Sequence, residues 1–125
     1  MSASFTLAAT VLGAPDPRGL SDFYCALLGW EVVESESDWV RIGPRDGSGL
    51  AFQREECHVP PAWPAGPGDQ QMQVHLDIAV TDLEPAVAAA QGLGASLADD
   101  QPQTDVRVLL DPAGHPFCLF REGGA

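Results

Sequence analysis

The chain has 125 residues, of which 45% are hydrophobic, and this length and composition fit one globular domain with a buried core. Acidic residues number 18 against six lysines and arginines, and the net charge of −12 argues against nucleic acids and anionic membrane surfaces as partners. No apolar run reaches the roughly 18 residues of a membrane span. No basic segment precedes an apolar one at the N-terminus, so we expect a cytoplasmic protein with no membrane partner. The spacing of Cys25, Cys57 and Cys118 matches no zinc motif, which favours reduced thiols.

The first half of the chain predicts a strand, a helix and three further strands. Asp16 is suited to cap a helix, and Pro17 fits the first helical position because its missing N–H is not needed there. Apolar residues then recur at helical spacing until Gly29, which predicts a helix over 17–28. Short apolar or alternating runs predict strands over residues 5–12, 30–33, 39–42 and 50–54.

The second half repeats this order after a proline-rich segment. Residues 57–71 hold four prolines, which remove ladder donors and predict a linker. Asp82 is again suited to cap a helix, and Gly92 and Gly94 mark its predicted end near residue 93. The predicted strands of this half cover residues 72–80, 95–97, 106–110 and 117–121.

The two halves are offset by a nearly constant distance. Asp16 and Asp82 lie 66 residues apart, and the turn glycines Gly47 and Gly114 lie 67 apart. We therefore predict an α+β fold of two βαβββ modules that form a cup-shaped mixed sheet with the helices on its outer face. Module one is expected at 1–56 and module two at 72–125, with the linker at 57–71 between them. Such a sheet leaves a concave inner face that can hold a small molecule.

Four stretches resemble the vicinal oxygen chelate superfamily, which includes glyoxalase, bleomycin-resistance and dioxygenase proteins. DPRGLSDFYCALLGW at 16–30 resembles the opening of its first module, and HLDIAVTDL at 75–83 resembles the start of its second. LDPAGHPFCL at 110–119 is similar to the closing turn and strand. VPPAWP at 59–64, together with the start of the second module, resembles a glyoxalase-like subgroup. The resemblance also implies a homodimer in which modules pair across subunits, and the alternative, in which a single chain closes its own two modules, stays open.

The resemblance implies metal ligands on the first and last strand of each module. In this chain those four positions hold Ala9, Ala51, His75 and Cys118. Alanine methyl groups cannot coordinate a metal, and catalytic zinc needs about three protein ligands. We therefore expect no cofactor, and a divalent metal on His75 and Cys118 stays open as the weaker alternative.

Six residues are expected to bind the small-molecule ligand on the inner face: Trp39, Gln53, Trp63, His75, Asp77 and Cys118. Trp63 has a second interpretation, in which it closes an apolar gap between the modules. His75 and Asp77 share one strand face and are candidates for a general-base pair, although the spacing of i and i+2 residues, about 6.5–7 Å, does not assure a direct bond. Cys118 is a candidate nucleophile or simply a packed apolar residue. His58 and His115 are expected to be solvated.

Two classes of function follow from these residues. The first is a metal-free protein that binds a small molecule, as drug-sequestering or ligand-sensing proteins do. The second is a lyase, isomerase or dioxygenase of the same superfamily, with an atypical metal site or a metal-free one. The two alanines at ligand positions favour the first class.

Overall fold

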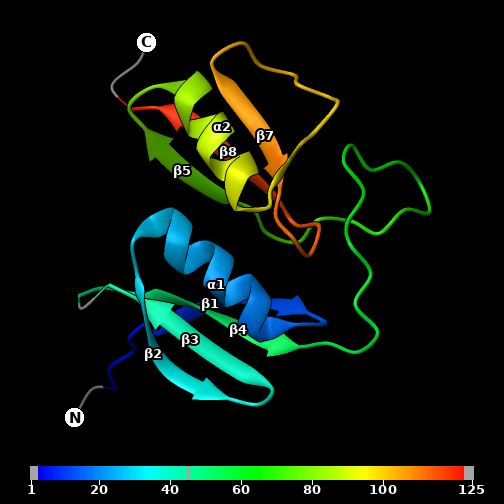
Figure 1. Ribbon diagram of the computed structural model, residues 1–125. Helices are drawn as coiled ribbons and strands as arrows, with labels where there is room; N and C mark the ends of the chain where they lie inside the picture. Colours follow the sequence, from blue (N-terminus) through cyan, green and yellow to red (C-terminus); the bar gives the residue numbers. More distant parts are fainter. Residues whose placement is uncertain (1–2, 45, 123–125) are drawn as a thin grey trace. The chain divides into compact units, whose positions relative to one another are not determined.

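The computed structural model describes residues 3–44 and 46–122, and the chain divides into two compact units, Met1–His58 and Val59–Ala125. Each unit contains one helix and one four-stranded mixed sheet in the order βαβββ (Figure 1). The α+β fold of two βαβββ modules is therefore confirmed. We call β1 to β4 with α1 module one, and β5 to β8 with α2 module two.

Module one has the sheet order β1-β4-β3-β2. Strand β1 runs parallel to β4, while β3 runs antiparallel to both β4 and β2. Its elements are β1 (Ala9–Ala14), α1 (Pro17–Leu28), β2 (Glu31–Glu36), β3 (Trp39–Gly43) and β4 (Gly49–Arg54).

Helix α1 begins and ends where local chemistry predicts. The carboxylate of Asp16 accepts a hydrogen bond from the backbone N–H of Gly19 at 3.1 Å, and Pro17 occupies the first turn. The helix ends at Gly29, whose φ of 70° lies in the left-handed region that glycine adopts without strain. Capping residues at both ends thus set the bounds of α1.

The core of module one lies between α1 and one face of its sheet. Tyr24 and Phe52 are fully buried, and their rings stack with centroids 5.7 Å apart. Phe23 meets the ring of Tyr24 edge-on at 4.9 Å. Because side chains alternate along a strand, Phe52 faces the helix while Ala51 and Gln53 belong to the opposite face.

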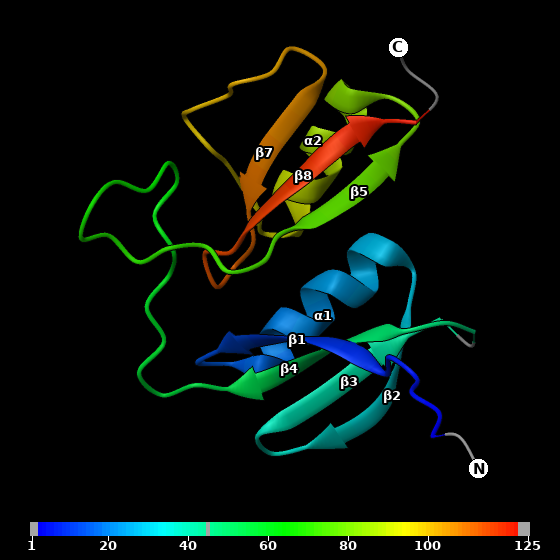
Figure 2. The ribbon, with the colours of Figure 1, turned by 180° about the vertical axis from the view of Figure 1, so that it is seen from behind.

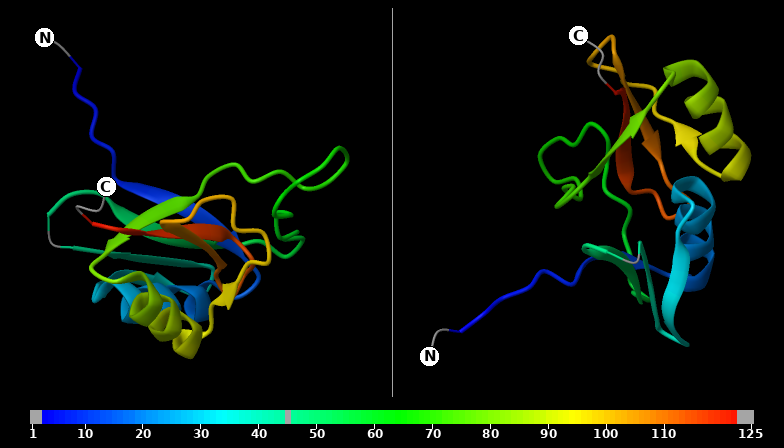
Figure 3. Two further views of the ribbon diagram at one scale, coloured as in Figure 1. Left: turned by 90° about the horizontal axis from the view of Figure 1, so that it is seen from above. Right: turned by 90° about the vertical axis from the view of Figure 1, so that its left-hand side faces the viewer.

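Module two has the sheet order β5-β8-β7-β6, with β5 parallel to β8 and the other pairs antiparallel. Its elements are β5 (Leu76–Val80), α2 (Leu83–Leu93), β6 (Ser96–Leu97), β7 (Val106–Leu110) and β8 (Pro116–Arg121). In each module the helix lies on one face of the sheet (Figure 3, right). The core of module two is built around Leu109, Phe117 and Leu119, all nearly inaccessible to solvent.

The N-terminal end of helix α2 is capped more weakly than the sequence predicts. Asp82 is the N-terminal cap residue, but its side chain makes no capping hydrogen bond. The helix ends at Leu93, as predicted, with Gly94 (φ 122°) as its C-terminal cap residue and Gly92 inside its last turn. Glycine costs about 1 kcal/mol in a helix without breaking it, so Gly92 alone does not end α2.

Two predicted strands begin later than expected. Strand β1 begins at Ala9 because its partner β4 begins at Gly49, so residues 5–8 have almost no ladder to join. Phe5, in this segment, is 94% exposed. Strand β5 begins at Leu76, opposite Phe117, for the same reason. A strand's length is set by its neighbour, which short-range patterns do not reveal.

Two contacts join the linker, whose course is drawn in Figure 2, to module two. The indole N–H of Trp63 donates to the carbonyl of Asp100 at 3.1 Å. Gly114, in the turn before β8, lies so close to Pro60 that an added Cβ would come within 2.6 Å of the proline Cβ. These contacts explain why the second compact unit begins at Val59. Among the described residues, no helix is both long and apolar enough to cross a membrane.

Candidate functional site

The register of β5, β8 and β7 brings chemically active side chains to one face of the module-two sheet. Asp77 on β5 pairs with Cys118 on β8, which in turn pairs with Val108 on β7. Phe117 and Leu119 point to the other face, where they are buried in the core beside α2. Asp77 and Cys118 therefore belong to the face away from α2, which Figure 2 shows with the helix behind the sheet.

His75 completes a cluster with these two residues. It lies one residue before β5, and its Nδ1 is 3.2 Å from Oδ1 of Asp77. One ligand atom from each of His75, Asp77 and Cys118 lies within 4.8 Å of the others. The direct His75–Asp77 contact, which residue spacing alone left open, is thus present in the structure.

The environment of Cys118 keeps its thiol protonated. Burial raises the pKa of Cys118, and the charge of Asp77 and a hydrogen bond to its carboxylate raise it further. A thiolate is the reactive form of cysteine, so this environment disfavours Cys118 as a nucleophile at neutral pH. His75 and Asp77 are more accessible, with 40% and 60% of their side chains exposed.

An open groove of about 410 Å³ lies over the same region of the sheet. It is lined by Asp77, Gln103, Asp105, Val106, Cys118, Phe120 and Arg121. This volume falls within the range of about 300–1,000 Å³ typical of small-molecule sites. The groove combines an apolar wall with two carboxylates, and Arg121 at the end of β8 borders both this groove and the depression at the start of α2.

Several groove residues were missed by the sequence analysis. Phe120 has the same strand parity as Cys118, so alternation along β8 could have identified it. Gln103 and Asp105 come from the loop before β7, and no local pattern places that loop beside the sheet. Arg121 is the last residue of β8, and no pattern in the sequence indicated that it would line a groove.

Two of the six predicted ligand-binding residues lie elsewhere, in module one. Trp39 and Gln53 are paired in register on β3 and β4. They line a shallow depression of about 420 Å³ together with Glu36, Asp38 and Arg54. The amide of Gln53 donates to Glu55 Oε1 at 2.7 Å.

Trp63 belongs to neither set of lining residues. Its indole N–H is hydrogen-bonded to Asp100, within the second compact unit. The six predicted residues therefore divide into a pair in module one, a cluster of three in module two, and Trp63 in the linker.

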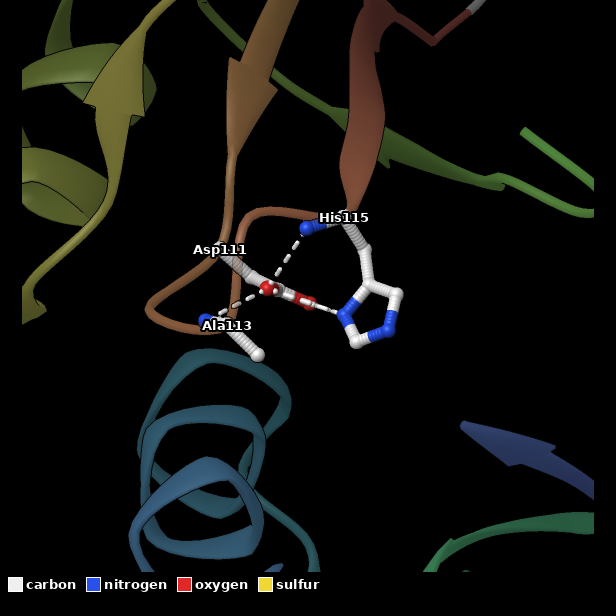
Figure 4. Close-up of polar contacts among 3 residues, drawn as sticks. All are labelled: Asp111, Ala113 and His115. Carbon is white, nitrogen blue, oxygen red and sulfur yellow. Dashed lines mark hydrogen bonds and ion pairs between the residues drawn. The ribbon is translucent and has the colours of Figure 1, made fainter. Parts of the chain in front are cut away.

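His115 is not solvated, which corrects the sequence-based expectation. Only 12% of its side chain is exposed, and its Nδ1 lies 2.9 Å from Oδ2 of the fully buried Asp111 carboxylate (Figure 4). Oδ1 of Asp111 also accepts hydrogen bonds from the backbone N–H groups of Ala113 and His115. The sequence did hold a pattern that could have predicted this contact. Asp111 lies four residues before His115, across a Pro-Ala-Gly turn, and such a turn needs an acceptor for its backbone N–H groups.

Comparison with known proteins identifies the family. A model of the glyoxalase-like domain matches residues 9–120, which is most of the chain. The protein belongs to the glyoxalase-like family. This places it in the vicinal oxygen chelate superfamily that the sequence motifs resemble. A search of curated protein sequences finds no match.

Solved structures show the same fold at low sequence identity. A glyoxalase/bleomycin resistance protein/dioxygenase family enzyme from Burkholderia phytofirmans has a TM-score of 0.72 at 18% identity, over 94% of this chain and 98% of that one. A glyoxalase-related enzyme from Fulvimarina pelagi has a TM-score of 0.68 at 18% identity, over 95% and 89%. The bleomycin-binding protein of Streptomyces verticillus, solved with copper(II)-bleomycin, has a TM-score of 0.60 at 19% identity, over 96% and 98%.

The four-ligand metal site that the superfamily resemblance implies does not fit this glyoxalase-like chain. Val11 pairs with Ala51 in module one as Asp77 pairs with Cys118 in module two, so the two modules present equivalent positions. The module-one ligand positions are alanines, Ala9 and Ala51, and their methyl groups have no lone pair to donate. All three clustered donors come from module two.

Proposed function

We propose that this glyoxalase-like protein binds a small organic molecule in the groove on the module-two sheet and needs no metal to do so. The observation that carries the proposal is the groove itself, where polar groups converge on an apolar wall. The bleomycin-binding protein of Streptomyces verticillus, which shares the fold, is a binding protein for a small molecule. The alanines at the module-one ligand positions support a metal-free mode of binding.

The groove lining indicates what kind of ligand would fit. Phe120 is 37% exposed and, together with Val106, offers an apolar surface to a ring or an alkyl chain. Asp77 and Asp105 accept hydrogen bonds, and Arg121 donates them. We expect a ligand with an apolar body, donor or cationic groups near the two carboxylates, and an acceptor near Arg121.

A thermal-shift screen of the chelator-treated protein, followed by calorimetry on the compounds that stabilise it, tests this proposal. We expect Phe120→Ala and Asp105→Asn to weaken binding of a confirmed ligand by about tenfold each, since one hydrogen bond or ring contact contributes about 1–1.5 kcal/mol. Gln53→Ala, in the module-one depression, is the matched control and should leave affinity unchanged. Equal loss in the control, or no loss in the groove variants, would place the ligand elsewhere.

The His75–Asp77 contact favours one alternative, a metal-free lyase or isomerase. At 3.2 Å the Asp77 carboxylate can orient His75 through Nδ1, which would leave Nε2 to accept a proton from a substrate. Once a turned-over substrate is known, His75→Ala should lower kcat by about 10²–10⁴-fold. Unchanged turnover in that variant would remove His75 from the mechanism.

The homodimer and the cytoplasmic location stay predictions. The homodimer is part of the proposal, and sedimentation equilibrium on the untagged chain tests it. A mass of twice the 13.2 kDa chain supports the homodimer, and a monomer mass across the concentration range contradicts it.

A further inference from the structure

We propose that Arg41, on the face of the module-one sheet away from α1, binds the carboxylate of a small organic acid. This site goes beyond the function proposed above, because it lies in the other module and shares no residue with the groove. It is built around a guanidinium group that has an unused hydrogen-bond donor, next to strands that carry small and aliphatic side chains on the same face.

The register of the sheet places Arg41 in the middle of this face. On β3 it pairs with Ala51 of β4, and Ala51 pairs in turn with Val11 of β1. Because Phe52 faces the helix, Ala51 and its register partners belong to the opposite face. Neither an alanine nor a valine side chain can accept a hydrogen bond, so β4 and β1 offer the guanidinium no side-chain partner at this level.

The Nε–H group of Arg41 is an orphaned donor. Its nitrogen is buried and, among the described residues, is the one buried side-chain nitrogen or oxygen that lacks a hydrogen-bond partner. The ion-pair partner of Arg41 is Glu34 on β2, but its Oε1 lies 3.8 Å from Nε, beyond the roughly 2.7–3.2 Å of a hydrogen bond. A buried donor without an acceptor costs free energy, so a folded protein that keeps one calls for a functional reason.

The equivalent position in module two shows that the fold itself does not need this arginine. Val108 on β7 pairs with Cys118 as Arg41 on β3 pairs with Ala51. An aliphatic residue therefore fits the same place in a βαβββ sheet, with no charge and no orphaned donor. The cost of Arg41 is better explained by a ligand than by stability.

A carboxylate with a single charge is the ligand group that fits best. It can accept in parallel from Nε–H and from one terminal N–H of a guanidinium group, which would satisfy the orphaned donor. Glu34 belongs to an edge strand and 56% of its side chain is exposed, so it can turn away and leave its place to the ligand. Glu34, Glu36 and the net charge of −12 repel anions, which favours one negative charge over the two of a phosphate.

Trp39 indicates what the rest of the ligand should be. It lies two residues before Arg41 on β3, hence on the same face and about 6.5–7 Å along the strand. Its side chain lines the module-one depression of about 420 Å³. A short alkyl chain can join an aromatic ring on the indole to a carboxylate at Arg41. The probe is therefore 3-phenylpropionate, and the uncharged 3-phenylpropionamide is its matched control.

NMR titration of the full, untagged, ¹⁵N-labelled chain tests the site. We expect 3-phenylpropionate to shift the Arg41 Nε–H signal with a dissociation constant of about 1 mM, and the amide to leave it in place. Binding to variants is followed on the indole N–H signal of Trp39. Arg41→Val should weaken binding by at least about tenfold, while the urea midpoint of unfolding stays the same or rises. Glu34→Gln removes the competing carboxylate and should strengthen binding about two- to fivefold.

Two control variants separate this site from general charge and from the groove. Glu31→Gln makes the same charge change three residues from Glu34 on β2 and should leave affinity almost unchanged. Phe120→Ala, in the module-two groove, should also leave it unchanged, so the two binding proposals succeed or fail separately. Loss of 3-phenylpropionate binding in Phe120→Ala would move the ligand to the groove and overturn the Arg41 site.

Three other outcomes would overturn the proposal. An equal shift with the amide would show that the carboxylate is not recognised, and an equal shift with inorganic phosphate would show no preference for one charge. A lower urea midpoint in Arg41→Val would make the arginine a structural residue. If Arg41→Val does not fold, Arg41→Lys keeps the charge and lacks the two-pronged donor, and unchanged affinity in that variant would contradict the site.

Discussion

Val11 and Ala51 lie side by side on parallel strands of module one, and the equivalent pair in module two is Asp77 and Cys118. On the next strand the polar residue belongs to module one instead. Arg41 on β3 pairs with Ala51, whereas Val108 on β7 pairs with Cys118. The backbone registers agree, yet on the two parallel strands module two carries a carboxylate and a thiol where module one carries only aliphatic groups. The comparison shows that a repeated βαβββ backbone supplies equivalent positions, while the side chains at those positions determine which module can do chemistry.

The helix of module one is better packed and better capped than the helix of module two. Helix α1 buries Tyr24 and Phe23 and has a side-chain cap, whereas α2 buries only Ala90 and lacks such a cap. Module one therefore has the more strongly packed helix, while the exposed sheet face of module two carries the carboxylate and thiol of Asp77 and Cys118. The predictions below test this division, beginning with the largest expected effect.

Phe52→Ala should produce the largest loss of stability. The ring of Phe52 is fully buried against Tyr24, and its removal leaves a cavity, so we expect the free energy of unfolding to fall by about 3–5 kcal/mol. Urea unfolding followed by circular dichroism measures the change. Phe120→Ala, which removes a partly exposed ring from module two, is the control and should cost far less. Similar losses in both variants would show that the buried ring of Phe52 contributes no more to stability than a partly exposed ring.

The turn before β8 should be the next most sensitive site. Asp111→Ala removes the acceptor of two backbone N–H groups and the partner of His115, at an expected cost of about 2–3 kcal/mol. Module one has Pro44 at the position equivalent to Asp111. Asp105→Ala, on an exposed residue, is the control in the same denaturant titration. Equal stability of the two variants would show that the buried turn contributes little.

The two cap residues should respond unequally to the same substitution. Asp16→Ala removes a real hydrogen bond at the start of α1 and should cost about 1 kcal/mol. Asp82→Ala removes a side chain that makes no capping bond and should cost only a few tenths of a kcal/mol. Thermal unfolding of the two variants in parallel measures the difference. A larger loss for Asp82→Ala would reverse the comparison of the helices.

The smallest expected effect is a shift in the reactivity of Cys118 with pH. Burial and the Asp77 carboxylate raise the pKa of this thiol, so it should be alkylated fastest only in alkaline solution. Asp77→Asn removes one negative charge, which lowers the pKa and moves the alkylation profile toward lower pH. Mass spectrometry of peptides after timed iodoacetamide treatment follows Cys118, with exposed Cys57 as the internal control. An unchanged Cys118 profile in Asp77→Asn would mean that the two groups are not coupled.

Local chemistry in the sequence was enough to predict much of the fold. Asp16, Pro17 and Gly29 set the bounds of α1 because caps act through bonds between residues a few positions apart. The offset of 66 to 67 residues between the halves predicted the repeated module, and alternation along the strand predicted that His75 and Asp77 share one face. These inferences depend on short-range periodicity, which a single chain displays directly.

Long-range pairing decided the rest. The strands β1 and β5 begin where their partners begin, and only the folded sheet brings Asp77 beside Cys118. The groove needs the loop that carries Gln103 and Asp105 beside β8, and the His75–Asp77 contact needs side-chain rotamers that residue spacing does not determine. By itself the sequence determined the modules and the types of donor available. The tertiary structure alone decided which donors meet, because contacts between distant strands depend on register and packing and not on local propensity.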